Sequence, residues 1–192
     1  MIFKETSLKD AFTVQIEKIA DNRGYFATTF AIPDFESHGL NAIIKQTSSS
    51  FNNKRGTVRG MHFQVEPYVE TKLVRCVKGA IYDVIVDLRP DSPTYKKWLG
   101  FELSAENMLM YYIPEGFAHG YQTLTDDAEV HYMLGQVYSP QHARGIKHDD
   151  PEIGIKWPLP MTVISDRDAG LPTLKELMEK EPAIQFCKAM TK

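Results

Sequence analysis

The run Ile81-Tyr82-Asp83-Val84-Ile85-Val86-Asp87-Leu88 decides the fold class of this chain. Its even-numbered positions are all apolar, whereas positions 83, 85 and 87 read Asp, Ile and Asp. Side chains alternate between the two faces of a strand, so the pattern predicts a β-strand with one fully buried face and one mixed face. The mixed face is suited to line a cavity.

Short runs of the same kind continue along most of the chain, and turn residues such as Lys78-Gly79 separate them. The predicted strands are Thr13–Ile19, Tyr25–Phe30, Ile43–Ser49, Thr57–Phe63, Lys72–Lys78, Ala80–Leu88, Lys96–Leu103, Met108–Ile113, Ala118–Leu124 and Glu129–Tyr138. Helical spacing is present only at Pro33–His38 and Leu171–Lys180. Strands without helical crossovers predict an all-β fold. A cupin-type double-stranded jelly roll (β-helix barrel) with a short C-terminal helix protects the strand edges, and we expect it as a single domain over residues 1–192.

Composition and charge exclude several classes of protein. Of 192 residues, 43% are hydrophobic and 24% are charged, as in a globular domain. Lys plus Arg is 22 and Asp plus Glu is 25, which gives a formal net charge of −3 without a basic run, so we expect no nucleic-acid binding. No apolar stretch approaches the ~20 residues of a membrane-spanning helix, and the N-terminal residues carry no secretory pattern. We therefore expect a cytoplasmic protein.

The string Arg59-Gly60-Met61-His62-Phe63-Gln64 holds the densest group of reactive side chains. In a regular strand His62 and Gln64 share one face, and a bulge at Gly60 would bring Arg59 round to the side of His62. A histidine inside a barrel is either a proton shuttle or a core imidazole bonded to the backbone, and the sequence leaves both open.

Pro114-Glu115-Gly116-Phe117-Ala118-His119-Gly120 delivers a second histidine, His119, to the start of a strand. The spacing resembles the second motif of cupins. Metal-binding cupins supply a His-x-His pair, whereas Gln64 follows His62 here, and a metal needs at least three placed donors. We therefore expect no bound metal. In the alternative of a metal-binding cupin, His131 would be the third ligand.

Two further candidates have a structural and a chemical interpretation. Lys72 is either a cation facing His62, able to stabilise an enolate or a phosphate, or a solubilising charge on a strand edge. In Asp166-Arg167-Asp168, one carboxylate either orients an imidazole or belongs to a polar loop that caps the final helix. Cys76 and Cys187 lie far apart and suggest neither a disulfide framework nor a structural zinc site.

Together these strings resemble the dTDP-4-dehydrorhamnose 3,5-epimerase family from about Thr13 to Leu171. The strings that carry the resemblance are Asp21-Asn22-Arg23-Gly24-Tyr25-Phe26, the runs from Arg59 and from Pro114 quoted above, Lys72-Leu73-Val74-Arg75, Asp83 to Arg89, and Ile153-Gly154-Ile155-Lys156-Trp157-Pro158. The resemblance implies a cupin-type homodimer that exchanges N-terminal strands and needs no metal or organic cofactor.

The resemblance also implies roles for individual residues. His62 matches the general base, Asp168 the carboxylate that orients it, Tyr132 the proton donor on the opposite side of the sugar, and Lys72 the cation near the C4 oxygen. The matching substrate-binding residues are Arg23 and Phe26 on the exchanged strands, Gln46, Ser48, Arg59, His119, Tyr138 and Arg167. Among them Arg23 matches a phosphate contact lent by the neighbouring subunit, Gln46 a contact to the nucleotide base, and Tyr138 the aromatic ring that stacks on the base.

Three positions depart from the family pattern: Thr28 and Ala143 stand where an acidic residue is common, and Ser48 stands where an asparagine is usual. All three fall at implied nucleotide or phosphate contacts. The implied activity is inversion of C3 and C5 of a nucleotide-linked 4-keto-6-deoxyhexose, most simply a dTDP sugar. The alternatives are inversion of C3 only, a differently activated 4-keto sugar, a metal-dependent cupin, and a sugar-binding cupin without turnover.

Overall fold

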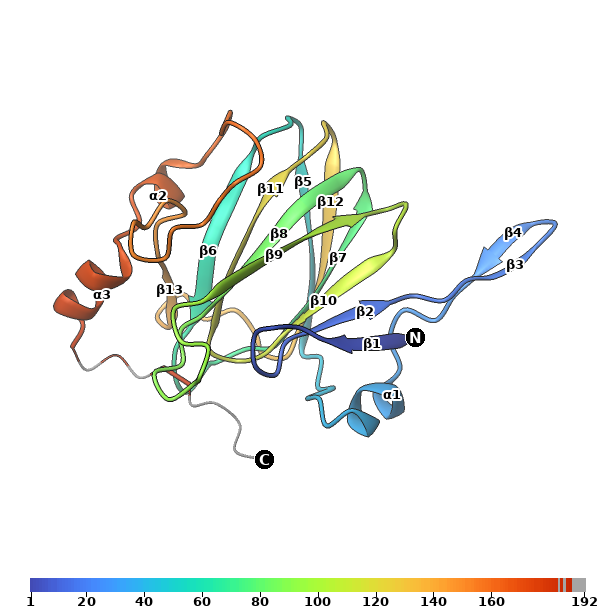
Figure 1. The fold of residues 1–192 in the computed structure, drawn as a ribbon, viewed down its shortest axis with the longest axis horizontal. Helices are drawn as coiled ribbons and strands as arrows, with labels where there is room; N and C mark the ends of the chain where they lie inside the picture. Colours follow the sequence, from blue (N-terminus) through green and yellow to red (C-terminus); the bar gives the residue numbers. More distant parts are fainter. Residues whose placement is uncertain (183, 185, 188–192) are drawn as a thin grey trace.

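The protein folds into two antiparallel β-sheets that face each other as a barrel, in a computed structural model that describes residues 1–182, 184 and 186–187 (Figure 1). The six-stranded sheet has the order β1-β2-β10-β7-β12-β5, and the five-stranded sheet has the order β13-β6-β11-β8-β9. The expected all-β jelly roll is confirmed.

The six-stranded sheet consists of β1 (Ile2–Glu5), β2 (Phe12–Gln15), β10 (Leu109–Ile113), β7 (Lys72–Lys78), β12 (Ala128–Leu134) and β5 (Gln46–Asn52). The five-stranded sheet consists of β13 (Ala143–Gly145), β6 (Val58–Gln64), β11 (Phe117–Thr123), β8 (Ala80–Asp87) and β9 (Trp98–Ser104). The remaining elements are the hairpin β3 (Ile19–Asp21) and β4 (Gly24–Phe26), and the helices α1 (Ile32–Ser37), α2 (Asp166–Ala169) and α3 (Leu174–Lys180).

Strand β8 shows how the alternating pattern builds the barrel. Ile81 and Ile85 belong to the core between the sheets, whereas Val84 and Val86 belong to a second core on the outer face. The C-terminal helices cover that outer face (Figure 1), and Leu174 of α3 packs there. The mixed face predicted for this strand therefore points into the barrel.

Several predicted boundaries were wrong. The strand expected at Thr13–Ile19 ends at Gln15, and Ile19 starts the separate β3–β4 hairpin, where its side chain is 72% exposed. The strand expected at Tyr25–Phe30 ends at Phe26 because Ala27 and Phe30 pack against a core cluster instead of pairing. The local pattern of apolar and polar residues does not show where hydrogen bonding to a neighbouring strand stops. Predictions made from this pattern therefore misplace the ends of strands.

Two other strands are shifted or shortened, and short elements were missed. Strand β5 starts three residues later than expected because its register is set by pairing with β12, where Gln46 faces Leu134. Strand β12 ends at Leu134 and not at Tyr138. The sequence did not predict β1, β13 or α2, and the C-terminal helix begins at Leu174 and not Leu171, with Thr173 as its N-cap.

Among the described residues no helix has the length and apolarity that crossing a membrane requires.

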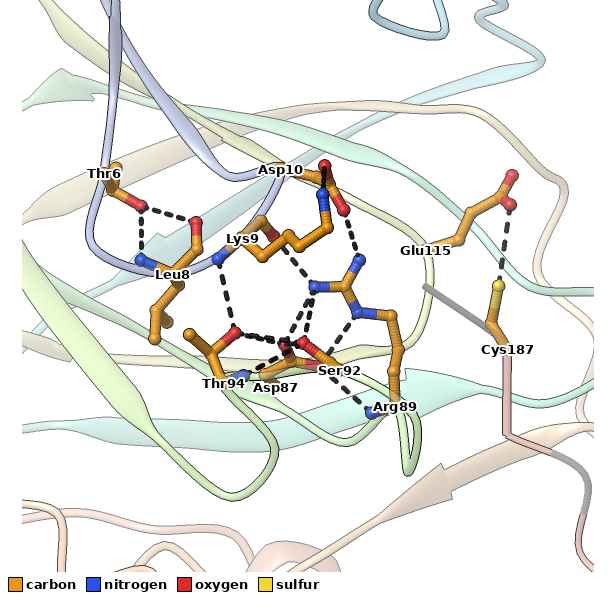
Figure 2. Close-up of polar contacts among 10 residues, drawn as sticks. All are labelled: Thr6, Leu8, Lys9, Asp10, Asp87, Arg89, Ser92, Thr94, Glu115 and Cys187. Carbon is orange, nitrogen blue, oxygen red and sulfur yellow. Dashed lines mark hydrogen bonds and ion pairs between the residues drawn. The ribbon is translucent and has the colours of Figure 1, made fainter. Parts of the chain in front are cut away.

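A buried charge network fastens the turn between β1 and β2 to the end of β8 (Figure 2). The Arg89 side chain is 1% exposed and donates to Asp87 from Nε (2.9 Å), to Asp10 (2.9 Å) and to the Lys9 carbonyl (2.8 Å). Burying a guanidinium is tolerable only because its donors are satisfied in this way. The network holds the N-terminal β1–β2 hairpin against the barrel.

Candidate functional site

A cavity of about 320 Å³ lies between the two sheets. The five-stranded sheet contributes Arg59, His62, Gln64, His119 and Tyr121, and the six-stranded sheet contributes Gln46, Ser48, Ser50, Lys72 and Tyr132. Tyr138, Ala143 and Arg167 lie at its rim. Most of the side chains that the sequence singled out therefore line one cavity.

A bulge in β6 brings Arg59 and His62 to the same side. His62 pairs with His119 and Arg59 pairs with Tyr121. The pairing therefore advances three residues along β6 while it advances only two along β11. A Cβ at Gly60, whose φ is +119°, would lie 2.5 Å from the Cα of Gly120, so only glycine fits this close approach. The bulge at Gly60, which the sequence left open, is therefore present.

His62 is paired with Asp168. The His62 Nε2 atom lies 2.7 Å from Asp168 Oδ1, while Asp168 Oδ2 accepts from the Gly60 N–H at 3.1 Å. Burial alone would raise the pKa of Asp168, but the His62 contact and the Gly60 hydrogen bond hold it below its usual value. An ionised carboxylate only accepts, so neutral His62 carries its proton on Nε2, and Nδ1 keeps a lone pair. Helix α2 places this carboxylate, and the alternative of a polar loop was wrong.

A second histidine–carboxylate pair lies deeper in the barrel. His119 Nε2 lies 2.8 Å from Asp83 Oδ2, and the Asp83 side chain is fully buried. Burial raises the pKa of Asp83, and His119 only partly offsets that effect. Asp83 lies on the mixed face of the predicted strand, and this position indicated that its side chain would point toward the cavity. The sequence did not show which histidine it would contact.

Lys72 points into the cavity and not to the sheet edge. Its ammonium forms an ion pair with Glu70, and the two side chains are 7% and 10% exposed. Gln64 also donates to Glu70, over 3.3 Å. The sequence did not identify Glu70 as a site residue, because Glu70 precedes the strand and lies outside its alternating pattern of apolar and polar residues.

Tyr132 faces His62 from the opposite sheet. Its ring lies edge-on to the His119 ring, with centroids 6.0 Å apart. The pKa of Tyr132 is raised well above its ordinary value. Burial is the main cause, and the neighbouring Tyr121 hydroxyl is the second. The phenol is therefore protonated at neutral pH and is available as a proton donor.

The residues expected to bind the substrate divide into two groups. Gln46, Ser48, Arg59, His119, Tyr138 and Arg167 line the cavity. Arg23 and Phe26 instead lie on the β3–β4 hairpin, which extends away from the barrel (Figure 1), and the Arg23 side chain is 86% exposed. One chain alone does not bring these two residues to the cavity.

The residue set gives little support to a metal centre. In the part of the chain that the structure describes, no three His, Cys, Asp or Glu side chains cluster closely enough to hold a metal ion. His131, the third ligand in the metal alternative, is the strand neighbour of Tyr132 on β12 and so projects from the opposite face.

Comparison with known proteins gives a consistent result over most of the chain. A model of the dTDP-4-dehydrorhamnose 3,5-epimerase family matches residues 5–176. The dTDP-4-dehydrorhamnose 3,5-epimerase of Sinorhizobium fredii is 44% identical over 178 residues, which are 92% of this chain and 91% of that protein.

Solved structures agree with this match. The dTDP-4-dehydrorhamnose 3,5-epimerase of Bacillus anthracis with TDP and PPi bound has a TM-score of 0.87 at 40% identity, covering 90% of this chain and 99% of that one. The dTDP-6-deoxy-D-glucose-3,5-epimerase of Legionella pneumophila in complex with dTDP-4-keto-L-rhamnose has a TM-score of 0.90 at 30% identity, covering 98% and 99%.

Proposed function

Because the chain belongs to the dTDP-4-dehydrorhamnose 3,5-epimerase family, we propose that it converts dTDP-4-dehydro-6-deoxyglucose to dTDP-4-dehydrorhamnose by inverting C3 and C5. One observation carries the proposal. His62 with its Asp168 partner and the protonated Tyr132 come from facing sheets and line the same cavity, with the buried cation Lys72 beside them. Inversion requires a base and an acid on opposite faces of one sugar ring.

Proton removal is the first step. The C4 ketone acidifies the hydrogen on C3, and His62 Nδ1 takes it as a proton. The electrons of the C3–H bond form a C3–C4 double bond, and the C4 oxygen becomes an enolate oxygen. The Lys72 ammonium stabilises that oxygen, and Asp168 stabilises the imidazolium.

Proton return from the other face completes the inversion. Tyr132 gives its phenol proton to C3 and the ketone re-forms. His62 then loses its proton to solvent and Tyr132 regains one, and with both groups reset the same two steps at C5 give the second inversion. Solvent hydrogen therefore enters the sugar at each inverted carbon.

Side chains at the mouth of the cavity are suited to the nucleotide. Arg59 and Arg167 are cations for a diphosphate, while Gln46, Ser48 and Tyr138 would meet the base. Related structures hold TDP or dTDP-4-keto-L-rhamnose, which supports a dTDP-linked substrate here.

We also propose a homodimer that exchanges N-terminal strands. Arg23 and Phe26 would then complete the site of the neighbouring subunit. Ile19 and Phe26 on the protruding hairpin are 72% and 70% exposed, an arrangement that a partner subunit would cover.

The test is incubation with dTDP-4-keto-6-deoxyglucose in D₂O, followed by NMR. Deuterium at C3 and C5 together with inverted product is expected, and deuterium at C3 alone would contradict inversion of both carbons. His62→Ala should lower the rate by at least ~10²-fold, the usual contribution of a general base, without changing the fold. If the wild-type protein incorporates no deuterium, the departures at Thr28, Ser48 and Ala143 indicate a different nucleotide sugar. GDP-, CDP- and UDP-linked 4-keto sugars are then tested in place of the dTDP sugar.

A further inference from the structure

Two glutamine side chains from opposite sheets hold the segment that carries Tyr138. On β6, Gln64 Oε1 accepts from the Ser139 N–H at 2.6 Å, and Gln64 Nε2 donates to the Val137 carbonyl at 3.2 Å. On β5, Gln46 Oε1 accepts from the Tyr138 N–H at 3.0 Å. Three consecutive residues are thus hydrogen bonded through their backbone to the two walls of the cavity.

The orientation of the Gln64 amide is fixed by its surroundings. The residue is only 4% exposed, and Nε2 also donates to the Tyr68 carbonyl at 3.0 Å. Rotating the amide by 180° would set Oε1 against two carbonyl oxygens and Nε2 against the Ser139 N–H. Leaving such buried groups unpaired is costly, so the observed orientation is strongly preferred.

The Tyr138 ring itself is 50% exposed, so its own packing does little to fix it. We propose that Gln64 is a positioning residue for nucleotide binding, which presets the backbone around Tyr138 so that the ring meets the base without further ordering. Preorganisation of this kind strengthens binding by reducing the entropy lost on association. The inference rests on the proposed function, in which Tyr138 stacks on the base.

The experiment is a double-mutant cycle with dTDP as the probe in isothermal titration calorimetry. Stacking of a base on an aromatic ring strengthens binding by about 5- to 150-fold, so Tyr138→Ala should weaken dTDP binding by about fivefold or more. Gln64→Leu should weaken it by about tenfold in the wild-type background but less than about twofold in the Tyr138→Ala background. A purely structural role for Gln64 predicts equal losses in both backgrounds.

A second variant keeps the test decisive if Gln64→Leu does not fold. Gln64→Met keeps the side-chain length without adding a charge beside Glu70, but it can neither accept from Ser139 nor donate to Val137, so it should show the same dependence on Tyr138. Lys45→Met is the matched control, because Lys45 contacts the side chain of Gln136 beside the same segment only at the exposed surface (3.1 Å), and its affinity for dTDP should be unchanged.

The outcomes separate the two proposals. If Tyr138→Ala binds dTDP normally, the stacking role fails and the inference fails with it. If Tyr138→Ala binds weakly but the Gln64 variants bind normally, or lose affinity equally in both backgrounds, the positioning role is overturned and the proposed function stands.

Discussion

Replacing Asp168 with asparagine changes the tautomer of His62, although the two side chains are nearly identical in shape. In wild-type protein one carboxylate oxygen faces His62 Nε2 at 2.7 Å, and the other accepts from the Gly60 N–H at 3.1 Å. If the Asn oxygen keeps the Gly60 bond, its NH₂ group faces Nε2. His62 must then carry its proton on Nδ1, where the substrate requires a lone pair.

The opposite amide orientation restores the tautomer at a cost. The NH₂ group then faces the Gly60 N–H, and a buried unsatisfied donor costs ~1–3 kcal/mol, which lowers the active fraction by about 5- to 150-fold. Losing the negative charge weakens the bond to the imidazolium by about a further 1 kcal/mol, or roughly fivefold. We therefore expect Asp168→Asn to lower the rate of epimerisation on the order of 10²-fold.

The assay is deuterium incorporation at C3 under substrate saturation, with thermal unfolding measured alongside to confirm an intact fold. Asp166→Asn is the matched control, because Asp166 lies on the same helix α2 but is exposed, and its rate should stay within about twofold of wild type. A folded Asp168→Asn protein with a rate within tenfold of wild type would refute the assignment of His62 as an Asp168-oriented base.

Four further outcomes test other parts of the molecule. Tyr132→Phe should still exchange the C3 hydrogen with solvent but form no inverted product, since only the return proton from the opposite face is lost; normal product by NMR would mean another donor. Lys72→Met should slow exchange by roughly 10²-fold, because the enolate loses its cation, and unchanged exchange would remove Lys72 from the mechanism. Arg89→Met leaves buried carboxylates unpaired and should lower the free energy of unfolding in urea by about 3–5 kcal/mol, whereas Lys96→Met, at a partly exposed ion pair, should cost less than ~1 kcal/mol. Burial alone would raise the pKa of Asp87, but hydrogen bonds from Arg89 and two hydroxyls hold that pKa below its ordinary value. Its stabilisation is therefore present above the ordinary pKa of an aspartate and is lost as the pH falls through the lowered pKa; Asp87→Asn should flatten this acid dependence of unfolding.

Predictability from the sequence varied with how local each feature is. The alternation in Ile81–Leu88 identified β8, and the sequence allowed the Gly60 bulge as a possibility because glycine in a strand can mark such a position. The start of β5 was misplaced by three residues because pairing with β12 sets it. Glu70 was missed because its contact with Lys72 depends on a turn that precedes the strand.

The sequence by itself determined the strand-rich architecture and the set of reactive side chains, because strand periodicity and residue chemistry are local properties. Only the tertiary structure decided the pairing of those side chains. Asp168 meets His62 across 106 positions of sequence, and His119 meets Asp83 across 36. Such pairs are chosen by sheet order, register and burial, which act between segments that are distant along the chain. Tertiary packing likewise directs the Lys72 side chain into the cavity, where its ammonium pairs with the buried carboxylate of Glu70. The strand pattern alone allowed Lys72 to lie on either face.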